Sequence, residues 1–262
     1  MRWTWLIFLA LPLLAGCPVV QPQDTPVDQR LAQSAVGDEA HWLYVPSTYR
    51  PSRPVPLVIT LHGTYGFDSA SAQIREWKAL AERHGFIVAA PPLQSVQGIL
   101  PRIPSLWYSD LARDEETILN LLQDVTRDYR IARDGSTGKR LVLLTGFSAG
   151  GYPMYYTGLR NPSLFHALVA RAANCDDGIF ERVEVIPELR QLHVIIYYGR
   201  ADLLIIPSQS RAAFGWLREH GVTNAELHQV SGGHWRHPEY AWDFWCDHLP
   251  ARFRPEASDS NP

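Results

Sequence analysis

The chain has 262 residues, 46% of them hydrophobic, which is enough for one large domain with a sizeable buried core. Its formal net charge at pH 7 is −3 and it contains no basic run, so electrostatics do not support nucleic-acid binding. It has no Gly-rich phosphate-binding loop and no cysteine or histidine spacing typical of a metal site. We therefore expect neither a cofactor nor a metal ion.

The amino terminus has the features of a bacterial lipoprotein signal. Arg2 supplies a positive charge, and residues 3–14 form an apolar run too short to span a bilayer comfortably. Residues 14–17, Leu-Ala-Gly-Cys, resemble a lipobox, in which cleavage precedes Cys17 and its thiol is lipidated, for example with palmitate. The alternative is an ordinary secretory signal with an incidental cysteine. Pro18 in place of aspartate favours the outer membrane or cell surface over the inner membrane as the site of the anchor.

Composition divides the rest of the chain into three parts. Residues 17–39 are rich in Pro, Gln, Asp and Ser, and are expected to form a flexible tether behind a signal peptide of residues 1–16. Residues 40–250 are expected to form the globular domain. Residues 251–262 are polar and contain proline, which predicts a disordered tail.

Strand-like and helix-like segments alternate along the predicted domain. Short segments that are apolar, or that mix apolar and polar residues, predict strands at 41–45, 57–61, 86–90, 141–144, 167–172, 192–198 and 225–230. Helical spacing of apolar residues predicts helices at 68–83 (capped by Asp68), 111–129, 152–159, 208–220 and 238–249. Residues 94–110 lack periodicity and are expected to form a long loop, while 181–189 are ambiguous. The alternation predicts an α/β fold: a doubly wound, mostly parallel sheet flanked by helices, with no large cap domain.

The pentapeptide Gly-Phe-Ser-Ala-Gly at 146–150 follows a predicted strand and precedes a predicted helix. In that context G-x-S-x-G forms a sharp turn that lifts the hydroxyl of Ser148 above the sheet edge. Gly146 and Gly150 lack a Cβ, so the strand and the helix can approach closely. The amide of Ala149 then points to where an oxyanion would develop. Ser148 is therefore the predicted nucleophile, although a Gly/Ser turn without chemistry is the alternative.

A serine nucleophile needs a histidine base and an acid that orients it, and both should follow later strands. Asp202 follows the strand predicted at 192–198 and is the predicted acid; Asp176 and Asp177, after the preceding strand, remain alternatives. His234 follows two glycines after the last strand and is the predicted base among ten histidines. His237 is its nearest rival, but it lies farther from the strand.

A second oxyanion donor is expected in the loop after the strand at 57–61. His62, Gly63 and Thr64 open this loop, and the amide of Thr64 is the predicted donor. Loss of one such donor typically costs about 3 kcal/mol of transition-state stabilisation. His62 is expected to brace the loop and not to transfer protons.

Together these motifs resemble the α/β-hydrolase superfamily over residues 40–250. The resemblance rests on His62-Gly63, the Gly-Phe-Ser-Ala-Gly-Gly turn at 146–151, Gly199 with Asp202, and Gly233-His234, in that order. The turn and the tryptophan beside the histidine are similar to polyhydroxyalkanoate-depolymerase-like and feruloyl-esterase-like secreted esterases. Without a cap insertion, the site is expected to be open, which favours large or surface-bound substrates.

The resemblance implies a serine hydrolase acting on small-molecule or polymeric carboxylic esters. The lipobox-like segment adds a location at the cell envelope, with attachment to the membrane through lipid on Cys17. A peptidase or an acyltransferase using the same triad is an alternative. A non-catalytic envelope binding protein on the same scaffold is another. The oligomeric state stays open.

Aromatic and cysteine residues leave further alternatives. Four aromatic residues in loops at the predicted catalytic edge could line a substrate pocket or merely pack their loops: Tyr65, Trp107, Tyr108 and Trp235. Cys175 and Cys246 are the two cysteines besides Cys17, and the sequence leaves open whether they form a disulfide.

Overall fold

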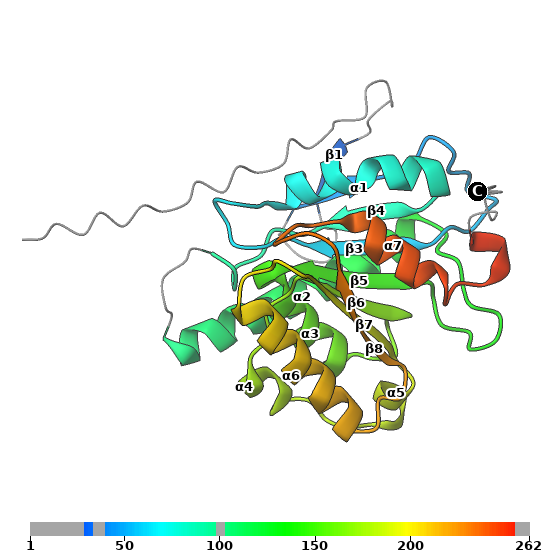
Figure 1. Cartoon of the computed structure of the whole chain (residues 1–262). Helices are drawn as coiled ribbons and strands as arrows, with labels where there is room; N and C mark the ends of the chain where they lie inside the picture. The colour runs from blue at the N-terminus through cyan, green and yellow to red at the C-terminus, as the bar shows by residue number, and fades with distance from the viewer. Residues whose placement is uncertain (1–28, 34–39, 98–102, 255–262) are drawn as a thin grey trace, which may run out of the picture.

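The computed structural model describes residues 29–33, 40–97 and 103–254 (Figure 1). The predicted signal peptide, Cys17, and parts of the predicted tether and tail lie outside these ranges. Within the described ranges, none of the helices combines the length and the apolar character that crossing a bilayer requires.

Among the described residues, eight strands form one sheet in the order β1-β2-β4-β3-β5-β6-β7-β8. They are β1 (Gln29–Gln33), β2 (Ala40–Tyr44), β3 (Leu57–Leu61), β4 (Ile87–Ala90), β5 (Val142–Phe147), β6 (Ala167–Arg171), β7 (His193–Gly199) and β8 (Ala225–Val230). β1 and β2 extend the sheet antiparallel, and every other neighbouring pair is parallel. The carboxyl ends of β3 and of β5 to β8 therefore lie at one edge of the sheet, where parallel sheets bind ligands.

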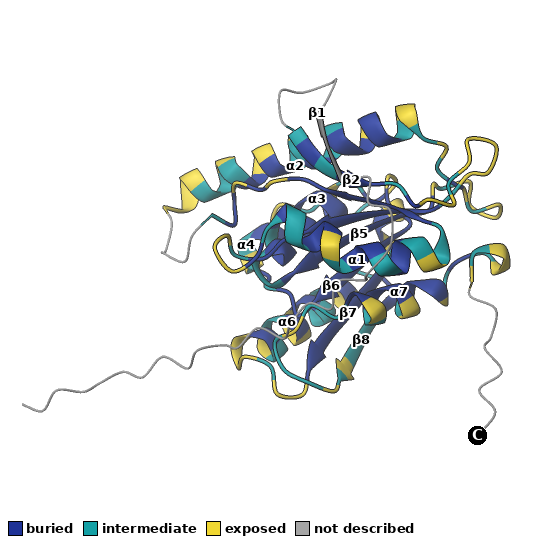
Figure 2. Ribbon diagram, turned by 90° about the horizontal axis from the view of Figure 1, so that it is seen from above, coloured by how far each residue is buried: buried dark blue, intermediate teal, exposed yellow. Residues whose placement is uncertain are grey.

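Helices cover both faces of the sheet (Figure 1). They are α1 (Ala70–His84), α2 (Pro104–Asp128), α3 (Gly151–Arg160), α4 (Asp177–Phe180), α5 (Pro187–Arg190), α6 (Ile205–Glu219) and α7 (Pro238–Cys246), with short 3-10 turns η1 (Ser148–Gly150) and η2 (Ala251–Phe253). α1 and α7 pack on one face, and α2, α3 and α6 pack on the other. Figure 2 shows the central strands buried between these two layers.

The continuous apolar runs of the central strands follow from this arrangement. Leu57, Ile59 and Leu61 of β3 pack with the α2 and α3 side, and Val58 packs with the α1 and α7 side; all four are fully buried. Because both faces of the strand are covered, no position is left for a polar side chain to reach solvent. The predicted doubly wound α/β fold is confirmed.

The long loop predicted at residues 94–110 is wrong in its second half. Helix α2 begins at Pro104, a residue whose fixed φ suits the first turn of a helix. None of residues 104–110 is buried, so this part of α2 has no apolar stripe and gives no periodic signal in the sequence. Trp107 and Tyr108 consequently lie on the first turns of a helix and not in a loop.

Three boundaries also differ from expectation. Ser69, not Asp68, caps α1, and its hydroxyl accepts a hydrogen bond from the Ala72 amide. Strand β1 lies inside the range predicted as a tether, residues 17–39, and pairs with β2. The predicted tether is therefore too long at its carboxyl end. The predicted tail begins inside the described turn η2.

Cys175 and Cys246 are both free and buried. Cys175 packs in the core on the α3 and α6 side, whereas Cys246 packs in the core on the α1 and α7 side. The sheet lies between them, so this structure contains no disulfide joining the two residues.

Candidate active site

The turn after β5 holds Ser148 in a strained backbone conformation. Its φ is 50°, in the left-handed region that residues with a side chain rarely adopt. A Cβ at Gly146 would collide with the carbonyl group of Gly150, and a Cβ at Gly150 would collide with the backbone carbonyls of β3 and the following loop. The Asn174 amide donates a 2.8 Å hydrogen bond to the carbonyl oxygen of Ser148 and helps to hold the turn. The strand, turn and helix around Ser148 therefore have the geometry of a nucleophile elbow.

Three side chains from distant parts of the chain meet at the carboxyl edge of the sheet. The Nε2 atom of His234 lies 2.9 Å from the Oγ atom of Ser148. The Nδ1 atom of His234 lies 2.7 Å from the Oδ1 atom of Asp202. This is the relative arrangement of nucleophile, base and orienting acid that a Ser-His-Asp triad requires.

The loops after β7 and β8 fix the acid and the histidine. Asp202 has a fully buried carboxylate, which accepts hydrogen bonds from the amides of Leu203 at 2.7 Å and Gly199 at 3.3 Å. A Cβ at Gly199 would collide with the carbonyl oxygens of Gly232 and Gly233, so glycine is needed where the two loops cross. The ring of His234 also packs against Phe147, with ring centroids 5.0 Å apart. Backbone and packing contacts thus hold Asp202 and His234 in place.

The rival residues have other contacts. Asp176 caps α4 through the Gly178 amide and accepts a 3.1 Å hydrogen bond from the hydroxyl of Tyr108. His237 has a φ of 36°, and its carbonyl oxygen accepts a 2.6 Å hydrogen bond from the hydroxyl of Tyr197. Neither residue takes part in the arrangement around Ser148.

The loop after β3 lies directly against the elbow. A Cβ at Gly63 would lie 3.3 Å from the Cβ of Ser148. The buried ring of His62 makes a 2.8 Å hydrogen bond from Nδ1 to the Gly63 carbonyl oxygen, and burial lowers the pKa of His62. A neutral His62 that donates to the backbone matches its expected bracing role. Within residues 40–97 and 103–254, the amide of Thr64 donates no hydrogen bond to a backbone or side-chain acceptor.

The four predicted pocket residues separate into two pairs. Trp107 packs edge-on against Tyr152 and donates to the Ser95 carbonyl oxygen, and Tyr108 lies beneath the guanidinium of Arg182. These contacts hold α2 against its neighbours. Tyr65 and Trp235 are about half exposed, at 57% and 48%, and they follow Thr64 and His234 directly. Both side chains are therefore open to solvent beside predicted site residues.

Sequence patterns missed the polar residues beneath the site. Asp68, predicted as a helix cap, accepts a 2.8 Å hydrogen bond from the Gly63 amide and forms a 2.8 Å ion pair with Arg236. Arg171 lies in an otherwise apolar strand and is fully buried. A buried arginine in a central strand signals a compensating acidic partner, but it does not identify that partner.

The described residues include no group of three or more His, Cys, Asp or Glu side chains placed to hold a metal ion. The arrangement at the sheet edge is built from protein groups: a hydroxyl, an imidazole, a carboxylate and backbone amides. These groups suffice for acyl transfer through a covalent intermediate.

Comparison with solved structures identifies the fold. TT1662 from Thermus thermophilus has a TM-score of 0.62 at 16% identity, over 86% of this chain and 98% of that one. A CE1 ferulic acid esterase from Anaeromyces mucronatus has a TM-score of 0.59 at 16% identity, over 84% and 91%. The dipeptidyl peptidase 4 of Porphyromonas gingivalis has a TM-score of 0.61 at 15% identity, over 86% and 36%. The chain has the α/β-hydrolase fold, as the sequence motifs indicated.

Comparison at the level of sequence finds similarity over only part of the chain. No protein-family model matches this chain. The bifunctional acetylxylan esterase/xylanase XynS20E of Neocallimastix patriciarum is 26% identical over 124 residues, which are 47% of this chain. The match spans 16% of the length of that relative, so the relative's activity as a whole does not transfer to this chain.

Proposed function

We propose that this protein is a serine hydrolase that cleaves carboxylic esters through an acyl-enzyme intermediate. The observation that carries the proposal is the position of His234, whose two ring nitrogens lie within hydrogen-bonding distance of Ser148 and Asp202. The resemblance of the fold to that of a ferulic acid esterase, and the partial match to an acetylxylan esterase/xylanase, support esters as the substrate class.

The mechanism follows from the geometry. The Oγ atom of Ser148 attacks the acyl carbon, and its proton passes to Nε2 of His234. Asp202 holds the proton on Nδ1 and stabilises the imidazolium that forms. The carbonyl oxygen becomes an oxyanion, which the amides of Thr64 and Ala149 stabilise.

Collapse of this tetrahedral intermediate breaks the bond to the leaving alcohol, which takes the proton from His234. Water then attacks the acyl-enzyme, and His234 accepts a proton from that water. The second tetrahedral intermediate breaks down to release the carboxylic acid, and the proton on His234 returns to Ser148. No external oxidant, reductant or cofactor is needed to balance the reaction.

The location belongs to the same proposal. We place the protein at the bacterial cell envelope, anchored through lipid on Cys17 in the outer membrane or at the cell surface. The support is the lipobox-like sequence of residues 14–17 and Pro18, which lie outside the described residues. Metabolic labelling with an alkynyl palmitate tests it: the wild-type chain should be labelled, and Cys17→Ser should not.

Hydrolysis of p-nitrophenyl acetate by the purified full chain tests the activity. We expect turnover that stops when diethyl p-nitrophenyl phosphate, a serine-directed reagent, has reacted. Parallel assays with p-nitroanilide amides and with added alcohol acceptors separate an esterase from a peptidase and an acyltransferase. A chain that neither hydrolyses the ester nor reacts with the phosphate reagent would be a non-catalytic member of the fold.

A further inference from the structure

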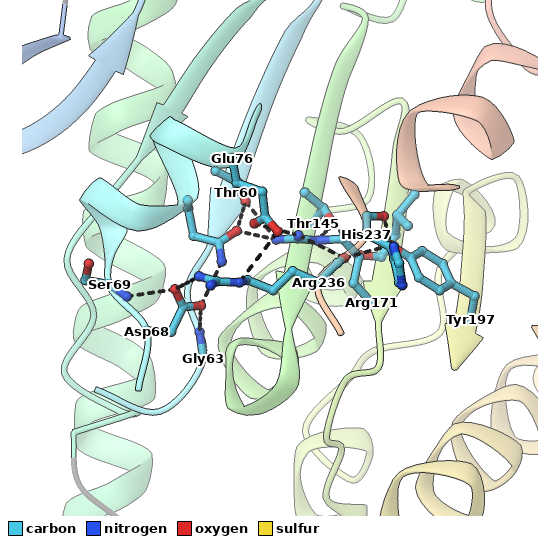
Figure 3. A network of polar contacts seen from close by, with 12 residues as sticks. Thr60, Gly63, Asp68, Ser69, Glu76, Thr145, Arg171, Tyr197, Arg236 and His237 are labelled. Atoms are coloured by element: carbon cyan, nitrogen blue, oxygen red, sulfur yellow. Dashed lines mark hydrogen bonds and ion pairs between the residues drawn. The ribbon is translucent and has the colours of Figure 1, made fainter. Parts of the chain in front are cut away.

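Four charged side chains form a cluster between the loop of Gly63 and the segment that follows His234 (Figure 3). We call it the buried charge cluster, and its members are Asp68, Glu76, Arg171 and Arg236. It contains two acidic and two basic groups. None of the four has a role in the chemical steps proposed above.

Asp68 holds the loop that carries the predicted oxyanion donor. Its Oδ2 atom accepts hydrogen bonds from the Gly63 amide at 2.8 Å and from the side-chain amide of Gln73 at 2.7 Å. Its Oδ1 atom accepts from the Ser69 amide at 2.8 Å. The side chain of Asp68 is 3% exposed. The position of Gly63, and therefore of Thr64 beside it, depends on this carboxylate.

Arg236 lies two residues after His234 and reaches the same carboxylate. Its Nη1 atom lies 2.8 Å from Oδ1 of Asp68, and its Nε atom lies 3.5 Å from Oε1 of Glu76. The carbonyl oxygen of Arg236 also accepts hydrogen bonds, from Tyr197 at 3.2 Å and from Arg171 at 3.4 Å. The segment that follows His234 is therefore held by both its side chain and its backbone.

Arg171 connects the cluster to the centre of the sheet. It donates to the hydroxyl of Thr60 on β3 at 2.9 Å and to that of Thr145 on β5 at 3.0 Å. It also pairs with Glu76 on α1 at 3.6 Å. Because β3 and β5 are the strands that lead into the Gly63 loop and the Ser148 elbow, the cluster is fixed to the rigid part of the molecule.

From these contacts we infer that Asp68 and Arg236 act as a positioning pair, which fixes the oxyanion loop relative to the loop of His234. The inference rests on the proposed serine-hydrolase function. Catalysis of this type needs the oxyanion donor and the base on opposite sides of the same reacting carbon, placed to within about 0.5 Å. The two loops follow β3 and β8, which are not neighbours in the sheet, so ladder hydrogen bonds do not join them. The ion pair does.

The role predicts a particular kinetic signature. An oxyanion donor acts mainly in the transition state, so its displacement lowers kcat and leaves KM nearly unchanged. Since both residues act through one contact, the double variant should be little worse than the worse single variant.

Asp68→Asn, Arg236→Gln and the double variant test the inference in the full chain. The kcat for p-nitrophenyl acetate is divided by the number of active serines, titrated by p-nitrophenol release from diethyl p-nitrophenyl phosphate. We expect a fall of at least tenfold in kcat per titrated site, with KM changed by less than threefold. Arg160→Gln is the matched control, since Arg160 forms a partly buried 3.1 Å ion pair with Glu115 away from the site. It should keep its kcat per site.

A purely structural role would lower the melting temperature and the number of titrated sites but leave kcat per site within twofold of wild type, and that result overturns the inference. Additive losses in the double variant also contradict it.

If Arg236→Gln does not fold, the kcat per titrated site of Arg236→Lys decides by the same criterion. Its single ammonium group retains the charge, and we expect an intermediate kcat per site, above any other folded variant of the pair. A wild-type chain with no ester turnover and no titratable serine would instead refute the proposed function, and the positioning role with it.

Discussion

The imidazole of His234 lies 2.9 Å from the hydroxyl of Ser148, although 86 residues separate the two in the sequence. They meet because β5 and β8 run parallel and end at the same edge of the sheet. The sharp turn at Ser148 and the paired glycines before His234 then direct both side chains over that edge. The relation is thus a consequence of parallel topology combined with two abrupt turns.

Replacing Asp202 with asparagine should lower kcat for p-nitrophenyl acetate by about 10⁴, as loss of the orienting carboxylate does in comparable triads. The amide can present its NH₂ group to Nδ1, which favours the wrong tautomer of His234. Asp176→Asn is the matched control, because Asp176 caps α4 and does not contact His234. Steady-state kinetics of the two variants check the assignment; an equal loss in both would argue against Asp202 as the orienting acid.

Replacing Gly199 with alanine should impair both folding and activity. The added Cβ would collide with the carbonyl oxygens of Gly232 and Gly233, and overpacking of this kind typically costs about 1–3 kcal/mol. Because these residues precede His234, we also expect a drop in kcat. Gly215→Ala in helix α6 is the control: its Cβ would meet nothing within 4 Å, and the change should stabilise the fold by roughly 0.5–1 kcal/mol. Urea unfolding and kinetics measure both effects, and an active, unchanged Gly199→Ala would show that the two loops do not cross as described.

Acidification from pH 7 to pH 5 should destabilise the protein through a pair of histidines far from the site. Burial lowers the pKa of His166 and of His193 to about 4. Neighbouring cationic groups, with His193 the largest for His166 and His248 the largest for His193, lower it further, whereas Asp134 and Glu226 oppose the shift. The unfolded chain, with histidine pKa values near 6.5, binds more protons over this range, so the free energy of unfolding falls as pH falls. His166 alone should contribute roughly 2 kcal/mol of this loss.

Thermal unfolding of wild type and of His193→Phe at pH 7 and pH 5 checks this prediction. The variant lacks one of the two histidines with a lowered pKa, so its melting temperature should fall less between these pH values. An equal or larger fall in the variant would contradict the assignment of the acid sensitivity to this pair.

The two buried thiols should be unreactive in the folded protein. Burial raises the pKa of Cys175 and of Cys246 to about 12, so almost no thiolate is present at pH 8. Iodoacetamide should therefore modify them only after unfolding, and a reducing agent should leave the melting temperature of the non-reduced protein unchanged. Rapid alkylation of the folded chain at either position would contradict the packing described for these residues.

Local patterns predicted the fold because strands and helices depend on features that are close in sequence. The apolar run at 57–61 is strand β3, and the mixed apolar and polar segment at 225–230 is strand β8. Ser148, Asp202 and His234 each lie a short distance past the end of a strand, so the rule for the carboxyl edge of a parallel sheet, together with the order of acid and histidine, predicts that they group there. Their catalytic roles remain proposals.

What the sequence did not reveal depends on contacts between distant elements. The start of α2 was missed because none of residues 104–110 is buried. The sequence predicts Asp68 as the cap of the first helix, whereas in the structure its carboxylate binds the Gly63 amide and Arg236, which is 168 residues away. Arg171 in an apolar strand signals an acidic partner, but the sequence does not identify Glu76 as that partner, since the fold brings the two residues together.

Mass spectrometry of the chain treated with diethyl p-nitrophenyl phosphate, combined with the activity of Ser148→Ala, decides whether Ser148 is the nucleophile. We expect one diethylphosphoryl group on the peptide that contains Ser148, and a loss of p-nitrophenyl acetate hydrolysis of roughly a thousandfold or more in the folded variant. Full hydrolytic activity in Ser148→Ala, or phosphorylation of a different residue with Ser148 unmodified, would contradict the proposed mechanism.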